Sequence, residues 1–244
     1  MSVRFLHSGD RALVVEFGDR IDHALSDRVL RLRASIRASN IPGVVETVPT
    51  FRSLLVLYDP LQIGSASLIT SIEALLDQGA RQARSARLWR IPACYDVSHA
   101  PDLPEVAERT GQSPEEIVRA HSETSFHVYM MGFVPGHPYM GDLPDSLALP
   151  RRKDPRMKVP AGSIAISGNL SVIYPIESPG GWHLIGASPV RLFDSAVAQP
   201  SLLSPGDKVR FCRISAVEFN EIRAAVETGN YSVPFEAPVH DAGP

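Results

Sequence analysis

The chain has 244 residues, of which 44% are hydrophobic and 21% charged, and its formal net charge is −3. These values are typical of a globular protein with one large domain or two ordinary ones, and the small negative charge does not favour a nucleic-acid partner. No apolar run approaches the roughly 20 residues that span a bilayer, and no signal-peptide core opens the sequence. Cys94 and Cys212 form no disulfide framework or CxxC site. We therefore expect a cytoplasmic protein with reduced thiols.

The first 84 residues are expected to form a small α+β domain. Residues 12–17 and 53–58 are rich in Val, Leu and aromatic residues, as strands are, and residues 41–49 contain a turn followed by a further strand. Two amphipathic helices complete the domain, and Asp22 is well placed to cap the first. Their apolar faces consist of Leu25, Val29, Leu32 and Ile36 in the first helix and of Leu68, Ile72, Leu75 and Leu76 in the second. This order predicts a sheet with helices on one side. The arginine-rich residues 79–87 that follow are expected to be a linker or a frayed helix end, and we place the domain boundary there.

Residues 85–226 are expected to form a mainly-β domain. A strand begins at Leu88, and a helix begins after Ser113, which forms a capping box with Glu116 and is followed by proline at the first helical position. From residue 125 on, short β-like runs alternate with turn residues; these runs are FHVYMM, GSIAIS, SVIYPI, GWHLIG, VRLF and DKVRFCRI. This spacing predicts a β-barrel or a sandwich. Residues 227–244 are expected to be an irregular tail.

Residues 132–144, with the sequence GFVPGHPYMGDLP, hold three glycines and three prolines directly after a good strand. Glycine lets the backbone adopt positive φ or approach a ligand closely, and proline makes the path rigid. Both a structural crossover at one end of a barrel and a ligand-binding loop fit this composition.

Two further segments of the second domain could carry chemistry. Residues 151–158, RRKDPRMK, have five basic residues against one acid and precede the turn VPAGS. They fit either a solvated loop or an anion site, since arginine donates two parallel hydrogen bonds to a carboxylate or phosphate. Residues 178–186, SPGGWHLIG, place two glycines beside a tryptophan, which fits either a tight ligand approach or a buried packing role.

The histidines of the second domain predict no metal site, because the spacing of His121, His127, His137 and His183 matches no HExxH or CxxC-type motif. His121 shares a helix face with Ile117, a position more typical of a core or interface histidine than of a catalyst. The absence of a GxSxG elbow and of a GxxxxGK[ST] loop argues against an esterase and an ordinary P-loop ATPase.

The order of these segments resembles a known family. The stretches GDRALVVEFGD, GFVPGHPYMGDLP, PRRKDPRMKVPAGSIAI, YPIESPGGWHLIG, LFD and LLSPGDKVRF are together similar to allophanate hydrolase subunit 1, a family that includes the B-type subunit of 5-oxoprolinase and the kinase inhibitor KipI. The resemblance extends over nearly the whole chain. It implies an α+β N-terminal domain, residues 1–84, followed by a cyclophilin-like β-barrel, residues 85–226.

The resemblance also implies a function, as the B-type subunit of an ATP-dependent 5-oxoprolinase that opens the lactam ring of 5-oxoproline (pyroglutamate) to give glutamate. Such a chain acts with a homologous barrel subunit and a larger A-type subunit. We therefore expect a hetero-oligomer, with ATP and Mg²⁺ bound at the level of the complex and little activity in the isolated chain.

In this enzyme, arginines would neutralise carboxylate or phosphate charge, and a histidine would transfer a proton. The candidate catalytic residues are His121 and His137. The candidate substrate- or anion-binding residues are Arg151, Arg152, Arg156, Gly136, Gly162, Ser163, Asn169, Gly180, Gly181 and Trp182.

Two other functions stay open. The chain could be a KipI-like histidine-kinase inhibitor or regulatory binding module, or the carboxyltransferase half of a biotin-dependent, urea-type carboxylase. Leu170 and Ala187 stand where relatives usually carry a polar amide and an arginine, and these two differences favour the binding module.

Overall fold

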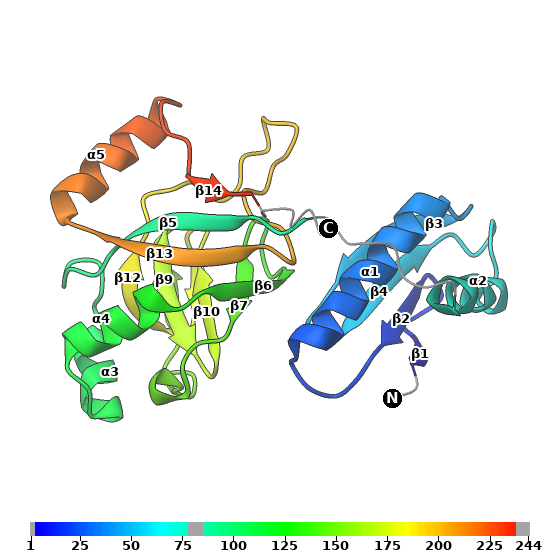
Figure 1. Ribbon diagram of the computed structural model, residues 1–244, viewed down its shortest axis with the longest axis horizontal. Helices are drawn as coiled ribbons and strands as arrows, with labels where there is room; N and C mark the ends of the chain where they lie inside the picture. The colour runs from blue at the N-terminus through cyan, green and yellow to red at the C-terminus, as the bar shows by residue number, and fades with distance from the viewer. Residues whose placement is uncertain (1–2, 78–84, 238–244) are drawn as a thin grey trace, which may run out of the picture. The chain divides into compact units, whose positions relative to one another are not determined.

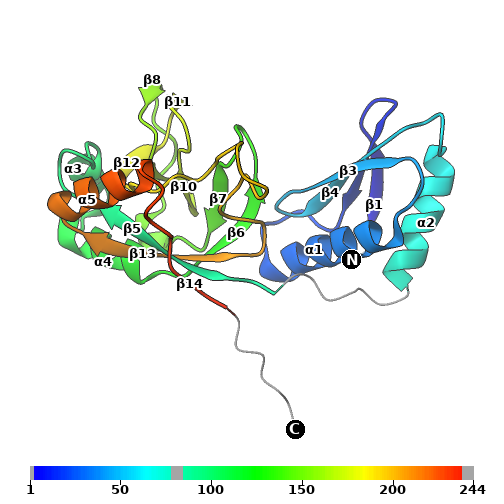
Figure 2. The same cartoon turned by 90° about the horizontal axis from the view of Figure 1, so that it is seen from above.

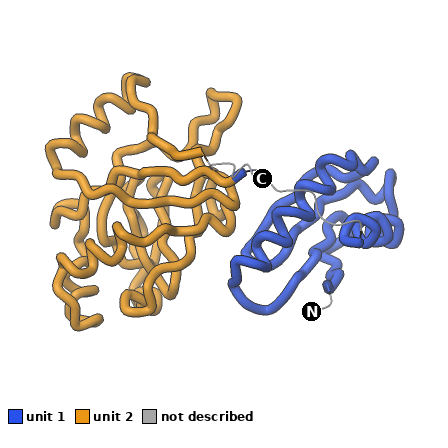
Figure 3. The backbone as a smooth tube through the Cα atoms, in the orientation of Figure 1, with its two compact units in different colours: residues 1–85 blue, residues 86–244 orange. Residues whose placement is uncertain are grey.

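The computed structural model describes residues 3–77 and 85–237, and the chain divides into two compact units, residues 1–85 and 86–244 (Figure 3). Each unit has its own hydrophobic core. Most of the linker predicted at residues 79–87 lies outside the described residues, as does the end of the predicted tail, residues 238–244. None of the helices in the described ranges has the length and apolar character needed to span a membrane.

The first unit is a four-stranded antiparallel sheet with two helices packed on it (Figures 1 and 2). In the sheet order β1-β2-β4-β3, its strands are β1 (Arg4–His7), β2 (Ala12–Glu16), β4 (Ser53–Tyr58) and β3 (Val44–Pro49), and its helices are α1 (His23–Ser39) and α2 (Ser65–Asp77). Alternate strand residues such as Leu13 and Val15 pack against the apolar faces predicted for both helices. The Asp22 side chain accepts hydrogen bonds from the backbone N–H groups of Ala24 and Leu25, which confirms the predicted cap. The sequence does not predict β1, because most of this edge strand is exposed.

The second unit is built on a closed mixed barrel of seven strands (Figure 1). In barrel order they are β12 (His183–Ala187), β9 (Ser163–Ser167), β10 (Leu170–Ile173), β7 (Pro138–Gly141), β6 (Phe126–Met131), β13 (Lys208–Ile214) and β5 (Leu88–Cys94). Pairing between β12 and β5, opposite each other at Ala187 and Cys94, closes the ring. β5 and β13 run parallel, and the other neighbouring pairs run antiparallel. A barrel was one of the two alternatives that the strand spacing predicted, and the structure confirms it.

Additional elements surround the barrel. They are α3 (Leu103–Thr110), α4 (Pro114–Glu123), the 3-10 turn η1 (Asp145–Leu147), α5 (Ala216–Glu227), the two-stranded ribbon of β8 (Arg156–Val159) and β11 (Ser178–Gly180), and β14 (Phe235–Glu236). The predicted capping box of Ser113 and Glu116 starts α4. In Figure 2 the β8–β11 ribbon projects from the barrel, so its residues are placed to form the wall of a surface site.

Three sequence expectations for this unit need correction. Residues 190–193, VRLF, form no strand and contribute only a single bridge, between Phe193 and Ser201. Neither α3 nor α5 was expected, although α5 begins with a readable capping box of Ser215 and Glu218. The tail is not wholly irregular, because its strand β14 pairs with β5, a tertiary contact that a two-residue pattern cannot reveal.

Candidate functional site

A pocket of about 360 Å³ opens in the second unit where the three motif segments meet. Its walls are formed by the β6–β7 loop and the start of β7, the segment before β8, the residue after β10, and the residues in and after β11. The lining residues are Phe133, His137, Tyr139, Arg151, Pro155, Tyr174, Pro179, Gly180, Gly181 and Trp182. We call it the Arg151 pocket. Its volume lies near the lower end of the ~300–1,000 Å³ typical of small-molecule sites.

The β6–β7 loop holds one wall of the pocket in a tightly turned conformation. Phe133 has φ of 73° and Gly136 has φ of 78°, and the first value is unusual for a bulky side chain. The backbone N–H of Gly132 donates to the carbonyl of His137 at 3.1 Å, which closes the loop at its base. A Cβ on Gly136 would lie 2.6 Å from the Cβ of Phe193, so only glycine fits there. The glycines of this segment therefore serve the backbone, and the loop presents Phe133 and His137 to the pocket.

Aromatic rings make up most of the pocket wall. Tyr174 belongs to a buried apolar cluster against which Tyr139 and Trp182 pack. The ring of His137 meets that of Tyr174 edge to face, with centroids 5.3 Å apart, and the rings of Tyr139 and Trp182 have centroids 6.1 Å apart. These flat, rigid surfaces suit a ligand with a planar group.

His137 is deeply buried in this wall, with 3% of its surface exposed. Its Nδ1 atom is buried and has no hydrogen-bond partner in the described structure. Burial lowers the pKa of His137 to about 4, so the imidazole is neutral at physiological pH. A neutral imidazole with a free nitrogen can donate or accept one hydrogen bond, depending on its tautomer.

The two adjacent glycines at the end of β11 have different surroundings. A Cβ on Gly180 would lie 2.3 Å from the hydroxyl oxygen of Tyr174, whereas a Cβ on Gly181 would make only ordinary contacts with Pro155, at 3.6 Å. The backbone N–H of Arg152 donates to the carbonyl of Gly181 at 2.8 Å and ties the β11 end to the basic segment. Gly180 is therefore required by close packing, whereas Gly181 would accept a Cβ without a clash.

Arg151 supplies the positive charge of the pocket. Within residues 3–77 and 85–237, no carboxylate forms an ion pair with its guanidinium. Burial raises the pKa of Tyr139 and of Tyr174, and the nearby positive charge of Arg151 opposes both shifts. The guanidinium is thus close to both phenols and available to an anionic ligand.

Arg152 and Arg156 are bound to carboxylates. Arg156 makes a bidentate ion pair with Asp102, at 2.6 and 2.8 Å, and Arg152 donates to Asp102 at 3.0 Å and to Glu105 at 2.8 Å. Asp102 is 3% exposed and also accepts the backbone N–H of Leu184 at 2.7 Å. We call Asp102, Glu105, Arg152 and Arg156 the Asp102 cluster. Because its charges are compensated internally, the structure argues against the anion-binding role expected for Arg152 and Arg156.

His121 lies in the barrel core, away from the lining of the Arg151 pocket, and is fully buried. The Tyr95 hydroxyl lies 2.8 Å from its Nδ1 and the Ser171 hydroxyl 3.0 Å from its Nε2, and its ring stacks on Phe211. Burial lowers the pKa of His121 to about 3. With both nitrogens engaged and the side chain fully buried, His121 is placed as a core residue outside the Arg151 pocket, and the structure brings it near none of the other candidate site residues that line that pocket.

The remaining candidates serve the backbone or pair locally. Gly162 has φ of 83°, and a Cβ there would lie 2.4 Å from the carbonyl oxygen of Ser188. Ser163 is buried in β9, and the Asn169 side chain donates to Asp145 at 2.7 Å. None of the three lines the Arg151 pocket. The residues that sequence reasoning missed are Phe133, Tyr139 and Tyr174, which lie in or directly beside the motif segments, and Asp102, which no motif marks.

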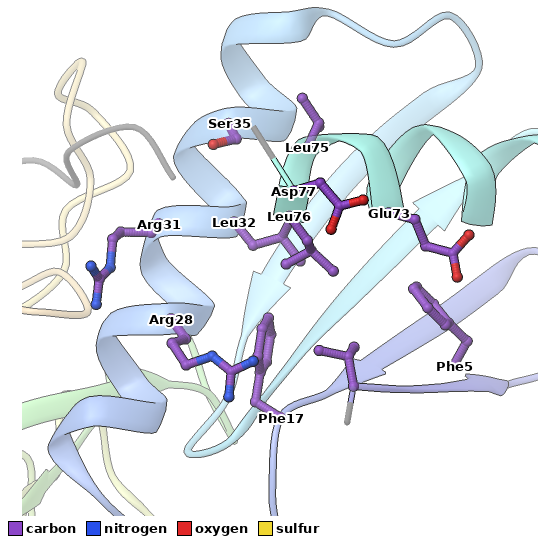
Figure 4. Close-up of a pocket in the computed structure, with 11 residues that line it drawn as sticks. Phe5, Phe17, Arg28, Arg31, Leu32, Ser35, Glu73, Leu75, Leu76 and Asp77 are labelled. Atoms are coloured by element: carbon purple, nitrogen blue, oxygen red, sulfur yellow. The ribbon is translucent and has the colours of Figure 1, made fainter. Parts of the chain in front are cut away.

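A pocket of about 620 Å³ in the first unit lies between α1, α2 and the start of the sheet (Figure 4). Phe5 and Phe17 supply apolar surface, and the Arg28 guanidinium lies 4.8 Å from the centre of the Phe17 ring. Glu73 and Asp77 add negative charge. Of the family-like stretches, GDRALVVEFGD contributes Phe17 to this lining, which ends at Asp77, the last residue before the first gap in the described chain.

Comparison with known proteins defines the class of this fold. A family model described as carboxyltransferase domain, subdomain C and D, matches residues 3–203. The solved Kluyveromyces lactis urea carboxylase superposes with a TM-score of 0.81 over 97% of this chain and 24% of that chain, at 20% identity, which shows a shared fold.

Closer relatives narrow the class. The B-type 5-oxoprolinase subunit of Bacillus subtilis is 37% identical over 90% of this chain and 97% of its own length. The crystal structure of TTHA0988 matches with a TM-score of 0.76 at 35% identity, and this chain spans 40% of that longer chain. The chain belongs to the family of B-type 5-oxoprolinase subunits, as the resemblance predicted.

Proposed function

We propose that this chain is the B-type subunit of an ATP-dependent 5-oxoprolinase, which opens 5-oxoproline to glutamate. The observation that carries the proposal is the end-to-end similarity to the Bacillus subtilis protein of that name. The Arg151 pocket supports it, since an arginine without an ion pair in the described structure, beside planar aromatic walls, suits a small ring that bears a carboxylate.

The proposal assigns this chain a binding and positioning role inside a larger enzyme. Its partners would be a homologous barrel subunit and a larger A-type subunit, assembled in the cytoplasm. His137 is a poor candidate for proton transfer, because a group whose pKa is about 4 is a weak base at neutral pH. We therefore assign His137 to hydrogen bonding and not to catalysis.

ATP and Mg²⁺ belong to the assembled complex in this proposal. The described residues include no group of three or more His, Cys, Asp or Glu side chains that could hold a metal ion. Arg152 and Arg156, which could have bound phosphate, already pair with Asp102. The nucleotide supplies the driving force for opening an unstrained lactam, and we derive no chemical step through it on this chain.

The finer assignment of the fold is part of the same proposal. The barrel is taken as cyclophilin-like, and residues 79–87 are taken to link two separately folded domains, residues 1–84 and 85–226. Limited proteolysis of the full chain should cut first within this linker, because few contacts cross a domain boundary. A protease-resistant fragment that runs unbroken through it would contradict the two-domain assignment.

Reconstitution tests the function. The chain should co-purify with the homologous barrel subunit, and addition of the larger subunit should give ATP hydrolysis that depends on 5-oxoproline. The chain alone should be nearly inactive. A reconstituted complex that does not hydrolyse ATP in response to 5-oxoproline would contradict the function, and robust turnover by the isolated chain would contradict the need for partners.

A further inference from the structure

Building on this proposed function, we propose that 5-oxoproline binds to this chain in the Arg151 pocket. The ring carboxylate pairs with Arg151, the flat lactam lies against Tyr139 and Trp182, and the amide hydrogen-bonds the imidazole of His137, which lines the pocket. The pocket thus selects a small planar amide with a single negative charge.

The charge of the lining sets the charge of the ligand. Arg151 is the one lining residue with a full charge at neutral pH, since the others are aromatic, proline, glycine or the neutral His137. A ligand with one carboxylate is neutralised by this pocket. Aromatic faces can also bind cations, but the guanidinium beside Tyr139 and Tyr174 repels an ammonium group.

The imidazole of His137 favours a polar ligand group, because it lines the pocket and is neutral. An amide carries both an N–H donor and a carbonyl acceptor, so it can pair with either tautomer of the neutral imidazole. A purely apolar ring would offer the imidazole no hydrogen bond.

The single positive charge and the aromatic wall of the Arg151 pocket disfavour glutamate, the open-chain product. Glutamate carries two carboxylates and an ammonium group, and the pocket lining provides a partner for one carboxylate only. Placing the second carboxylate against the aromatic wall is unfavourable because a desolvated charge needs a partner. The pocket should therefore bind the ring more tightly than the opened chain, which promotes product release.

A nucleotide is the main competing ligand, since bases also stack on aromatic rings. Its polyphosphate needs several cations, and of the three arginines in the basic segment two are held by Asp102. The structure therefore favours the single carboxylate over a triphosphate.

Binding to the full-length chain, measured by saturation-transfer NMR with ligand titration, tests the inference without any turnover. The probes are 5-oxoproline, 2-pyrrolidone (the lactam without a carboxylate), cyclopentanecarboxylate (the carboxylate without an amide), proline, glutamate and ATP. The variants are Arg151→Ala and, as a matched loss of one positive charge from the same segment, Lys153→Ala, whose side chain is exposed.

We expect 5-oxoproline to bind more tightly than each of the other probes. Arg151→Ala should weaken its binding about 10- to 100-fold, as loss of a charged hydrogen bond does, and Lys153→Ala should change it by no more than about threefold. Failure of the wild-type chain to bind 5-oxoproline, unchanged binding by folded Arg151→Ala, or tighter binding of ATP that displaces 5-oxoproline would overturn the inference.

This test separates the pocket from the proposed function. If the reconstituted complex turns over 5-oxoproline while the chain binds none, the pocket assignment fails and the function stands. If the chain binds 5-oxoproline through Arg151 and the complex does not turn it over, the function fails and the pocket assignment stands.

Discussion

Neighbouring arginines of one basic segment lie in two different environments, the Arg151 pocket and the Asp102 cluster. Arg152 and Arg156 share a buried carboxylate, whereas Arg151 lines an aromatic pocket and has no ion pair within the described ranges. Residue type and sequence proximity are the same in both places. The difference is set by Asp102, a residue about fifty positions away in the sequence that folding brings into contact with both Arg152 and Arg156. A run of basic residues therefore does not by itself distinguish a ligand site from a solvated loop. The carboxylates that pair with each basic side chain in the folded protein decide between the two.

The largest effect is expected from the Asp102 cluster. Asp102→Asn removes the charge shared by two arginines and leaves Arg156 uncompensated, while Arg152 keeps Glu105; this should lower the free energy of unfolding by about 3–5 kcal/mol. Chemical denaturation of the full chain measures this change. The matched control is Glu177→Gln, since Glu177 and its partner Lys158 are 58% and 79% exposed, and this pair should contribute less than about 1 kcal/mol. Equal small losses in both variants would show that the Asp102 cluster does not stabilise the fold.

For the Arg151 pocket we expect the opposite result, namely a small change in stability and a large change in ligand binding. Arg151→Ala should leave the free energy of unfolding within about 0.5 kcal/mol of the wild type, because no ion pair in the described structure depends on it. The same variant should weaken 5-oxoproline binding by about 1.5–3 kcal/mol. Arg151→Lys should lose most of that binding too, since lysine lacks the planar fork. Thermal unfolding and ligand titration on the same samples give the stability and the affinity for 5-oxoproline. A marked drop in stability with intact binding would mean that Arg151 stabilises the fold and does not bind the ligand.

Gly180, the last residue of β11, and Gly181, which follows it, allow packing and ligand space to be compared within the pocket. Gly180→Ala forces a methyl group against the Tyr174 hydroxyl and should cost about 1–3 kcal/mol of stability, with displacement of the aromatic wall. Gly181→Ala meets no atom closer than 3.6 Å and should leave stability nearly unchanged while it reduces the space for ligand. Unfolding curves of the two variants, measured side by side, check this. Similar stability in both would mean that the wall yields to the extra methyl group.

The smallest effect concerns pH. Burial lowers the folded-state pKa of His137 to about 4, below the usual value of 6.5, so the unfolded chain takes up a proton first as pH falls. The contribution of this histidine to stability is complete above pH 6.5 and is lost as pH falls toward 4, and His121 acts with the same sign. Affinity for 5-oxoproline should stay constant between about pH 5 and 8, because neither His137 nor the ligand carboxylate titrates there. A binding transition near pH 6.5 would mean that His137 is protonated in the pocket.

Features set by local chemistry could be predicted from the sequence. The caps at Asp22 and Ser113 and the apolar helix faces of the first unit depend on nearby residues, and the structure confirms them. The motif segments did mark the region of the Arg151 pocket, and Arg151, His137 and Trp182 line it.

What the sequence could not provide depends on contacts between distant residues. The ion pairs of Asp102 and the burial of His121 between Tyr95 and Ser171 both require the closed barrel. Tyr174 opens the stretch YPIESPGGWHLIG, but its role in the pocket wall depends on the close approach that Gly180 allows. Spacing along the chain identifies the segments that meet, and side-chain pairing in space decides which of their residues a ligand can reach.

Steady-state kinetics of the reconstituted complex tests most directly whether Arg151 holds the substrate carboxylate. The measurement is 5-oxoproline-dependent ATP hydrolysis by complexes that contain wild-type chain, Arg151→Ala or Lys153→Ala. We predict that Arg151→Ala lowers kcat/KM for 5-oxoproline about 10- to 100-fold, while the KM for ATP and the behaviour of Lys153→Ala remain those of the wild type. A folded Arg151→Ala complex with wild-type kcat/KM for 5-oxoproline would contradict this role of Arg151.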